Sequence, residues 1–415
     1  MAAKLANTRQ AGVTRKIHSL LFSGLYPSSV RPSHGIFVET RLRELLESGE
    51  VECRVVAPVP WFHSTDERFG NYARIARTPR CEQYHGIEVH HPRYLMLPKI
   101  GMYSQPLSMA LGALSTILQL RKRGFDFDLI DAHYFYPDGV AAAILAKWLN
   151  RPFFITVRGS DVNLVPEYWL PRTMMRWAAA RAHSLIGVSN ALLDGVRKWG
   201  IAVDRLQVIR NGVNLERFRP VPRPEARMRL GIQGAPIFLS VGNLVELKGH
   251  HITIEAFSEV VRDYPDARLV IIGEGPDQGR LMALVAQLGV TSRVVFAGML
   301  PQEDLYLWYS AADMSILASS REGWPNVLLE SMACGTPVVA TRISGIPEVV
   351  GSAVVGQLAE QRTVAAFGVL MRNVLSSPAD RRLVREYAEQ FSWEATTLAQ
   401  LNLFRRVAGH REFPA

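Results

Sequence analysis

The sequence predicts an α/β protein of two doubly wound domains, each with a parallel sheet covered by helices on both faces. Short apolar runs alternate along the chain with segments of helical spacing, which is the pattern of repeated β-α units. The alternation is interrupted once by a proline-rich segment and then resumes. The length of 415 residues also favours two domains, since domains average roughly 100–200 residues.

The first half has five apolar runs that we expect to be strands: Ile17 to Phe22, Cys53 to Ala57, Leu129 to Ala132, Phe153 to Val157 and Ser184 to Val188. The segments with helical spacing between them are Phe37 to Glu47, Gly139 to Leu149 and Leu170 to Arg181. Strands that are apolar throughout are typical of parallel sheets, because both faces of such a sheet are buried.

The second half repeats the pattern. Its expected strands are Ile237 to Val241, Leu269 to Ile272, Val294 to Phe296, Met314 to Leu317 and Pro337 to Ala340, and its helices include His250 to Arg262 and Gly279 to Leu288. Between the halves, the segment Arg219 to Pro224 has three prolines in five residues, which cannot continue a helix or a central strand. We therefore divide the chain into residues 1–215 and a second domain from residue 216 onward.

Composition and charge narrow the class of protein. Apolar residues make up 48% and charged residues 20% of the chain, as in a globular protein with ample core material. The net charge of +9 is compatible with an anionic membrane, with a phosphorylated small molecule or with solubility alone. Because Lys and Arg are dispersed and form no run of five, a nucleic-acid partner is not expected.

The three cysteines, Cys53, Cys81 and Cys334, are far apart and lack C-x-x-C spacing, which argues against a disulfide framework and fits a reducing compartment. The longest apolar stretch, Leu107 to Leu120, contains polar residues and is shorter than the ~18–20 residues that span a bilayer, so we expect a partly buried helix there. A cytoplasmic location is predicted, with peripheral contact to the inner face of the membrane left open.

The segment from Ser319 to Val339 carries most of the expected chemistry. It follows the strand Met314 to Leu317, and ligands of open α/β sheets bind beyond the carboxyl ends of strands. Pro325 suits the first turn of a helix, and Gly335 suits its C-cap.

The start of this helix predicts an anion site, because the free amides of Asn326, Val327 and Leu328 suit a diphosphate. Glu330, one turn in, suits a ribose diol, and Glu322 in the preceding loop suits sugar hydroxyls. The alternative is a solvent-facing loop with two surface glutamates.

The stretch EGWPNVLLESMACGTPVVAT resembles the E-x7-E motif of GT4-type retaining glycosyltransferases of the GT-B fold. Other segments resemble the family in the same order: LYPSSVRPSHGIFVETRLREL, GVSNALLDGV, VIRNGVNLERF, SVGNLVELKGH, IIGEGP, VVFAGML and FSWEATTLAQLNLFRRV. The resemblance covers nearly the whole chain. It implies two Rossmann-like domains facing a deep interdomain cleft, with residues 1–215 binding the acceptor and 216–390 the nucleotide-sugar, and a helix in 391–415 packing back on the N-terminal domain.

The resemblance also implies residue roles. Lys248 would neutralise the donor diphosphate and Glu322 would contact the donor sugar. The remaining donor-binding residues would be Gly35, Asn243, Gly275, Phe296, Gly298, Gly323, Pro325, Asn326, Val327 and Glu330. In many relatives an Arg stands at the position of Asn243, so a single-cation site or a compensating Arg elsewhere is expected here.

The first domain supplies candidates that follow expected strands. Arg158, where relatives often have a His, and His133 are the catalytic candidates, and Asp161 is expected on the acceptor side. A structural ion pair between Arg158 and Asp161, and a structural role for His133, remain alternatives. Gly35 allows the backbone to approach a phosphate closely.

Other chemistries lack their motifs. Gly273 to Gly279 misses the third glycine of G-x-G-x-x-G, since Gln278 stands there, and no Walker loop or G-x-S-x-G elbow occurs. No D-x-D motif follows a strand, so we expect no metal requirement and no cofactor.

The function that the resemblance implies is the retaining transfer of a hexose-type sugar from an NDP-sugar, UDP or GDP most simply, to a glycan or lipid-linked saccharide acceptor in cell-surface or exopolysaccharide biosynthesis. An anionic membrane surface is a further candidate partner, because the basic N-terminal region and the helix with Trp169, Met174, Met175 and Trp177 suit one, although these side chains also suit a core. The alternatives are an epimerase or phosphorylase of the same fold and a non-catalytic nucleotide-sugar-binding subunit.

Overall fold

The computed structural model describes residues 15–96 and 101–409, and it confirms an α/β architecture. The described residues form two compact units. The first unit contains residues 15–96, 101–133, 137–154 and 400–409, and the second contains 134–136 and 155–399. The division at residue 215 that the proline-rich segment suggests stays a prediction.

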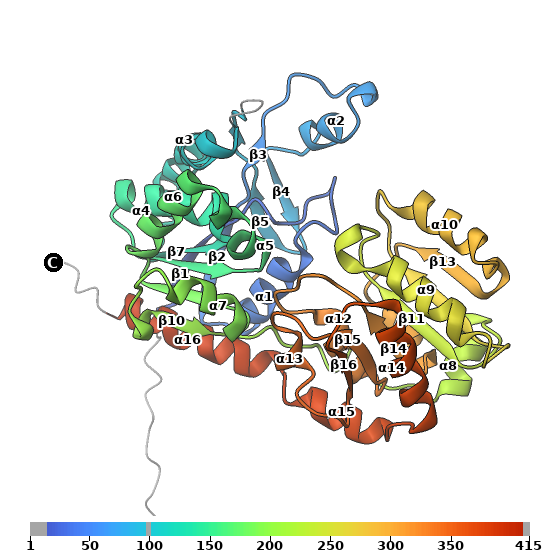
Figure 1. Cartoon of the computed structure of the whole chain (residues 1–415). Helices are drawn as coiled ribbons and strands as arrows, with labels where there is room; N and C mark the ends of the chain where they lie inside the picture. Colours follow the sequence, from blue (N-terminus) through green and yellow to red (C-terminus); the bar gives the residue numbers. More distant parts are fainter. Residues whose placement is uncertain (1–14, 97–100, 410–415) are drawn as a thin grey trace, which may run out of the picture. The chain divides into compact units, whose positions relative to one another are not determined.

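The first unit is built on a mainly parallel sheet whose strands lie in the order β7-β1-β2-β5-β4, with β4 antiparallel to β5 (Figure 1). The strands of this unit are β1 (Ile17–Phe22), β2 (Val51–Val56), β3 (Val59–Pro60), β4 (Cys81–Tyr84), β5 (Ile87–His90), β6 (Arg93–Tyr94) and β7 (Leu129–His133). Its helices are α1 (Ile36–Glu47), α2 (Asn71–Ala76), α3 (Gly101–Lys122) and α4 (Val140–Leu149).

The apolar runs predicted as strands in this unit are strands in the structure, and the observed ends differ from the predicted ends by few residues. The run predicted from Cys53 is β2, which begins at Val51 because Val51 pairs in register with Ile17 at the start of β1. Every residue of β7 is buried, as expected for a strand in the middle of a parallel sheet. The strand β4 was not predicted, since its residues alternate between exposed and partly exposed and form no apolar run.

The apolar stretch Leu107 to Leu120 lies within α3, as expected for a partly buried helix. One face, with Met109, Ala113 and Ile117, is buried. The residues Leu107 and Leu111 on the opposite face are 50% and 57% exposed. None of the helices in residues 15–96 and 101–409 is long and apolar enough to cross a membrane.

The second unit contains a fully parallel six-stranded sheet in the order β13-β12-β11-β14-β15-β16. Its strands are β11 (Ile237–Val241), β12 (Arg268–Ile272), β13 (Val294–Gly298), β14 (Met314–Leu317), β15 (Val338–Thr341) and β16 (Gly356–Ala359). The second unit also holds β9 (Ser184–Gly187), β10 (Leu206–Val208) and the last three residues of β8 (Phe153–Val157), which pair in the order β10-β9-β8, while Phe153 and Phe154 belong to the first unit.

The helices of the second unit are α5 (Ser160–Asn163), α6 (Trp169–Ala179), α7 (Asn190–Arg197), α8 (Arg223–Leu230), α9 (His250–Val260), α10 (Gln278–Gln287), α11 (Leu305–Ala311), α12 (Asn326–Ala333), α13 (Ile346–Val349), α14 (Val364–Ser376) and α15 (Arg381–Glu389). Helices α9, α10 and α14 pack together on the six-stranded sheet, and α8, α11, α12 and α15 form a second group that also contacts its strands. The core of the first group is dominated by Phe238, Phe257 and Phe367.

The last helix, α16 (Trp393–Ala408), continues from the second unit into the first. Within the first unit, Gln400 donates a hydrogen bond from Nε2 to Asp131 at 2.9 Å, and the ring of Phe404 packs 5.3 Å from that of Phe154. Arg405 forms an ion pair with Glu50 at 2.6 Å. The end of the chain therefore packs on the unit formed by its beginning, as the predicted fold requires.

The core under α9 gives a test of this fold. Phe257 is fully buried and packs edge-on against Phe238, with ring centroids 5.7 Å apart. We expect Phe257→Ala to lower the free energy of unfolding by about 3–5 kcal/mol, because it removes a large buried side chain and leaves a cavity. Urea denaturation of the whole chain measures this change. The matched substitution Val369→Ala, at a position 54% exposed on α14, should cost far less, and equal losses would contradict the packing.

Candidate functional site

The loop after β14 and the start of α12 form the centre of the candidate site. Pro325 is the N-cap of α12 rather than part of its first turn, because its ψ of 91° is not helical. Its carbonyl accepts the Leu328 amide at 3.0 Å, which corrects the expectation that this amide is free. Among the described residues, no protein acceptor is recorded for the amides of Asn326 and Val327. Two amides, not three, thus remain available to an anion at this helix end.

The other end of α12 is closed by Gly335, as predicted. Gly335 has a φ of 75°, its amide donates to Met332, and the Thr336 amide donates to Ser331. These two bonds form a Schellman motif, in which glycine takes the left-handed position. The motif ends the helix sharply, so that the chain enters β15 three residues after Gly335.

Lys248 and Glu322, the two predicted catalytic residues of this half, form an ion pair. The Nζ of Lys248 lies 2.6 Å from Oε1 of Glu322, and the Ser319 hydroxyl donates to the same oxygen at 2.7 Å. The side chains are 22% and 11% exposed, so both remain accessible from solvent. The sequence separation of 74 residues is bridged because both follow neighbouring strands, β11 and β14.

A tight backbone contact holds these two loops together. Lys248 ends a short 3₁₀ turn (Glu246–Lys248), and Gly249 follows with a φ of 71°. A β-carbon on Gly249 would lie 2.0 Å from the carbonyl oxygen of Ala318, so no other residue fits there. The Ser320 amide also donates to the Leu247 carbonyl at 2.9 Å. These contacts set the distance between Lys248 and Glu322.

Glu330 is buried within the same unit and is already hydrogen-bonded. The Tyr309 hydroxyl donates to its Oε2 at 2.9 Å, and Gln302 Nε2 donates to its Oε1 at 3.3 Å. Gln302 in turn accepts from Arg217 at 2.6 Å. Burial raises the pKa of the Glu330 carboxyl, while the two donors and Arg217 act in the opposite direction.

Arg158 and the loop after β8 belong to the second unit and lie against Gly323. A β-carbon on Gly323 would lie 2.0 Å from the Arg158 carbonyl oxygen. The Arg158 guanidinium donates to the Asn211 side chain at 3.3 Å, and Asn211 donates to Asn326 at 3.3 Å. The backbone carbonyl of Asn211 accepts from the indole of Trp324 at 3.1 Å. Asn211 therefore connects Arg158 with the start of α12.

Asp161 is fully buried, and its carboxylate holds the backbone of the Arg158 loop. It accepts the amides of Phe135 and Gly159 at 2.7 Å and that of Arg158 at 3.1 Å. Its partners are thus backbone groups, which fits support of the loop better than contact with an acceptor. Burial raises the pKa of Asp161, and the three amides and Arg158 counteract it.

His133 and Gly35 lie in the first unit. The His133 side chain is 1% exposed, and its Nε2 lies 3.1 Å from Asp131. Asp131 also accepts from Gln400, which places His133 beside a buried polar network. Gly35 is the N-cap of α1 with a φ of 74°, and a β-carbon on it would lie 2.3 Å from the Leu25 carbonyl oxygen.

The remaining predicted donor-binding residues lie near the ends of β11, β12 and β13. Asn243 is exposed after β11, and a β-carbon on Gly275 would lie 2.3 Å from the Leu244 carbonyl oxygen. Gly298 ends β13, where the register with β12 shifts, and its carbonyl accepts the Gly273 amide at 2.8 Å. Phe296 on β13 is partly buried.

No role was predicted for four residues of the site: Ser319, Tyr309, Gln302 and Asn211. Each is connected to a predicted residue by a hydrogen bond, but three of the four are distant from it in sequence. Asn211 lies in the segment VIRNGVNLERF that resembles the family, yet nothing in the sequence shows that its side chain bonds Arg158. Ser319 lies three residues before Glu322, and its position in the same loop was the available signal.

Known proteins match both halves of the chain. The family described as Glycosyltransferase Family 4 matches residues 40–217, and the one described as Glycosyl transferases group 1 matches residues 222–391. A Bacillus subtilis (strain 168) glycosyltransferase named for teichuronic acid biosynthesis is 31% identical over 338 residues, which cover 80% of this chain and 82% of that protein. A D-inositol 3-phosphate glycosyltransferase of Acidothermus cellulolyticus is 36% identical over 321 residues, covering 71% and 70%.

Among solved structures, the Anabaena protein HepE in complex with UDP has the same fold, with a TM-score of 0.69. The superposition covers 94% of this chain and 100% of that one, at 19% sequence identity. At this identity the likeness concerns the fold, which is that of two Rossmann-like domains.

A buried histidine two residues after Lys248 predicts a pH dependence of stability. His250 is buried at the start of α9, and its Nδ1 lies 3.0 Å from the Ser240 hydroxyl. Burial lowers the pKa of His250 to about 4, and the charge of Lys248 acts in the same direction. Unfolding returns this pKa to about 6.5, so the unfolded chain binds the proton first and stability falls as the pH drops from about 6.5 to 4.

We expect this histidine to contribute about 3 kcal/mol to the loss of unfolding free energy over that range. Urea denaturation of wild type and His250→Asn at pH 7 and pH 4.5 measures it. The variant should lose less stability on acidification than wild type. An identical loss in both proteins would contradict the buried neutral state of His250.

Proposed function

Because this chain belongs to the GT4-type glycosyltransferases and is a transferase of that family, we propose that it moves a hexose-type sugar from UDP- or GDP-sugar to a glycan or lipid-linked saccharide, with retention at the anomeric carbon. The observation that carries the proposal is the pairing of Lys248 with Glu322 beside the open amides of α12. The pair provides both groups that a nucleotide-sugar needs: a cation for its diphosphate and a carboxylate for its hydroxyls.

The diphosphate would displace Glu322 from Lys248. Lys248 is held by its turn within reach of the loop that begins α12, and an ammonium gains more from a diphosphate of two charges than from one carboxylate. The amides of Asn326 and Val327 add the positive end of the helix dipole. Asn243 carries no charge where many relatives have an Arg. Arg158, which is linked through Asn211 to Asn326, would supply the second positive charge instead.

Glu330 would accept the hydroxyls of the ribose. A carboxylate offers about four lone-pair directions, and Tyr309 and Gln302 occupy two of them. The ribose hydroxyls would donate to the remaining lone-pair directions. These hydrogen bonds would favour the ionised form of the Glu330 carboxyl, which burial alone disfavours. The Tyr309 and Gln302 bonds keep the carboxylate oriented before the ligand arrives.

In the transfer itself, the bond between the anomeric carbon and the diphosphate oxygen breaks and a bond to the acceptor oxygen forms. The acceptor proton passes to the departing diphosphate, whose charge Lys248 and the helix amides stabilise. No divalent cation is needed for this step, because Lys248 supplies the neutralising charge. UDP is the favoured nucleotide, since HepE, of the same fold, was solved with UDP.

The acceptor is proposed to be an anionic compound. The Bacillus relative is named for teichuronic acid biosynthesis, and the Acidothermus relative for D-inositol 3-phosphate. Both names denote acidic compounds. The basic character of this chain, with a net charge of +9, would favour the approach of such acceptors.

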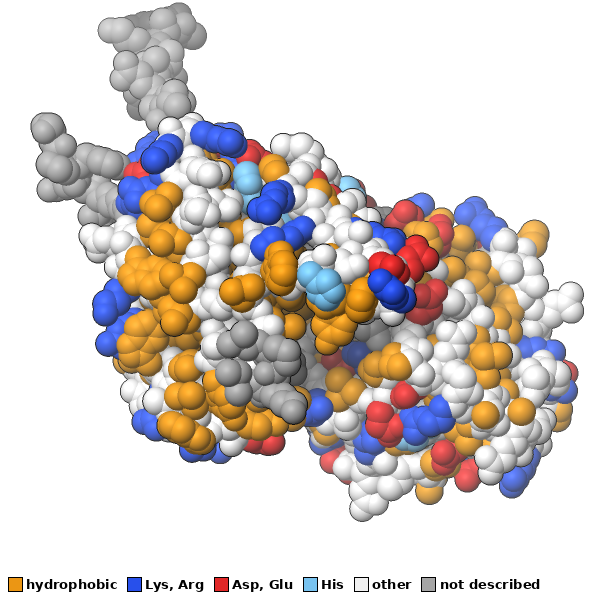
Figure 2. All heavy atoms as spheres, turned by 90° about the horizontal axis from the view of Figure 1, so that it is seen from above, with side chains coloured by type: hydrophobic (Ala, Val, Ile, Leu, Met, Phe, Trp, Pro, Cys, Tyr) orange, Lys and Arg blue, Asp and Glu red, His pale blue; other side chains and the backbone are white. Residues whose placement is uncertain are grey.

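An anionic membrane is proposed as a further partner, contacted through α3 rather than α6. Of the candidate residues on α6, Met175 is fully buried, Met174 and Trp177 are partly buried and Trp169 is 68% exposed. On α3, Tyr103, Leu107 and Leu111 form a continuous exposed stripe at intervals of four residues. Hydrophobic side chains also gather on the face seen in Figure 2. Lys122 and Arg121 end the same helix, which suits binding in the interface of an anionic bilayer. The basic N-terminal residues lie outside the described part of the chain.

We expect Lys248→Ala to lower kcat/KM with the sugar donor by at least about 100-fold, because it removes the main stabilising charge of the leaving group. Turnover is measured with UDP- and GDP-sugars in the presence of EDTA. Glu330→Gln, which keeps a hydrogen-bonding group beside Tyr309, should weaken nucleotide binding more than it lowers kcat.

The control is Lys198→Ala, an exposed lysine after α7 that should keep wild-type turnover. Wild-type turnover by Lys248→Ala would overturn the proposed site. Release of the nucleotide without any acceptor, or phosphorolysis of a glycan, would point instead to an epimerase or a phosphorylase.

The membrane contact predicts that the double variant Leu107→Glu, Leu111→Glu no longer floats with vesicles of anionic lipid at low salt. Wild type should float and should be released at high salt, since part of the attraction is electrostatic. Leu398→Glu, at a position 55% exposed on α16, should float like wild type. Failure of the wild type to bind at low salt would reject the membrane contact.

A further inference from the structure

A separate group of potential metal ligands lies on the β4–β5 hairpin of the first unit. Cys81 opens β4, and Glu88 and His90 lie on β5. The ligand atoms of these three side chains all lie within 4.8 Å of one another. None of the donor-site residues belongs to this hairpin, so the group is independent of the transferase chemistry.

The pairing of the strands explains why the three side chains converge. Cys81 and His90 are directly opposite each other in the antiparallel pair, and Glu88 precedes His90 by two residues. In a strand, residues two apart share a face, and opposed residues of paired strands share it as well. Thiol, imidazole and carboxylate thus project from one face of the hairpin. The contact is already close at one point, since His90 Nε2 lies 2.7 Å from Glu88 Oε1.

The distances between the three ligand atoms suit a small metal ion. Tetrahedral zinc bound at its usual ligand distances requires neighbouring ligand atoms to be about 3.3–3.7 Å apart. Cys81 is exposed and the Glu88 side chain is 28% exposed, so both can rotate by the small amount needed, whereas His90 is fixed by burial. The second oxygen of Glu88 is held by Arg54 Nε at 2.9 Å, an outer contact that would orient the carboxylate.

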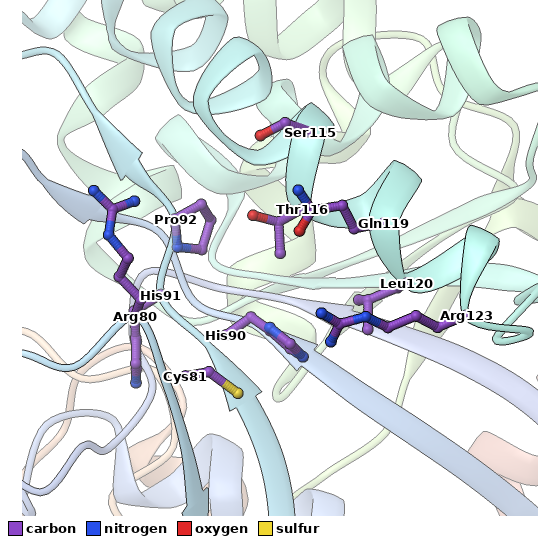
Figure 3. A pocket seen from close by; sticks show the side chains of 10 residues that line it. All are labelled: Arg80, Cys81, His90, His91, Pro92, Ser115, Thr116, Gln119, Leu120 and Arg123. Atoms are coloured by element: carbon purple, nitrogen blue, oxygen red, sulfur yellow. The ribbon is translucent and has the colours of Figure 1, made fainter.

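A cavity of about 260 Å³ adjoins the group and is lined by Cys81 and His90 as well as by α3 (Figure 3). Its other lining groups include Thr116 and Gln119 of α3 and Arg123, which directly follows that helix. Figure 3 shows the guanidinium of Arg123 pointing toward the imidazole of His90. Such a space leaves room for a fourth ligand from solvent, and the arginine favours an anionic one.

We propose that Cys81, Glu88 and His90 bind a zinc-type transition-metal ion with three protein ligands and one open position facing the cavity. Thiolate, carboxylate and imidazole together suit zinc, and the two negative ligands balance its charge. Binding displaces the thiol proton of Cys81 to solvent, and no redox change accompanies it.

The ion would fasten the edge strand β4 to β5. β4 is the last strand of its sheet, and edge strands are held by only one neighbour. Glu82, next to Cys81, accepts the Ser29 amide at 3.2 Å and contacts His91 at 2.9 Å. Holding β4 therefore also holds the loop before Gly35.

The test uses the full chain after removal of metal by a chelator. Calorimetry with zinc chloride should give one zinc per chain, and Co²⁺ should produce a thiolate-to-metal charge-transfer band. Cys81→Ser should abolish the band, and Cys81→Ser and His90→Gln should each raise the zinc Kd by more than about 100-fold, since they remove a direct ligand. Because Cys81 is exposed, the metal-free Cys81→Ser variant should melt at the same temperature as metal-free wild type, which shows that the variant folds.

The matched control is His85→Gln, in the turn of the same hairpin but outside the group, which should bind zinc like wild type. A cobalt complex without the thiolate band, or an unchanged zinc Kd for Cys81→Ser, would overturn the proposal. Sugar transfer in EDTA reports on the donor site alone, so failure of the metal site and failure of the proposed function are distinguishable.

Discussion

The contact between the loops after β11 and β14 is the constraint on which the donor site depends. Gly249 lies so close to the Ala318 carbonyl that a single β-carbon would separate the loops. Because the two strands are parallel neighbours, their carboxyl ends meet at one edge of the sheet. The proximity of Lys248 and Glu322 follows from that geometry, since each residue lies within four residues of this contact in the sequence. A second close approach, between Gly323 and the Arg158 carbonyl, adds Arg158 to the same region.

The regular part of this structure could be predicted from the sequence because its strands are apolar on both faces. β1, β8, β11 and β14 have the predicted ends, whereas the edge strand β4 was missed. The E-x7-E motif located Glu322 and Glu330, but Pro325 was placed inside the helix that it precedes. Proline is compatible with both positions, and the choice depends on the ψ angle that the loop imposes.

The partners of the site residues could not be predicted, because tertiary structure alone brings them together. Tyr309 and Gln302 reach Glu330 from positions 21 and 28 residues earlier, and Asn211 is 53 residues from Arg158. Neither pattern nor spacing encodes such contacts. The physical state of a residue depends on them: Glu330 was predicted as a ribose ligand from its motif, yet its burial and its two donors decide how readily it ionises.

The route of α16 has a consequence for the order in which this protein is completed during synthesis. Arg41 is fully buried, and its Nε donates to Gln400 at 2.8 Å, while Gln400 also donates to Asp131. The ribosome releases Arg41 and Asp131 long before Gln400, which follows Arg41 by 359 residues in the sequence. Folding proceeds from the N-terminus as the chain emerges, so the first unit acquires this buried polar contact only after residues 155–399 of the second unit have been made.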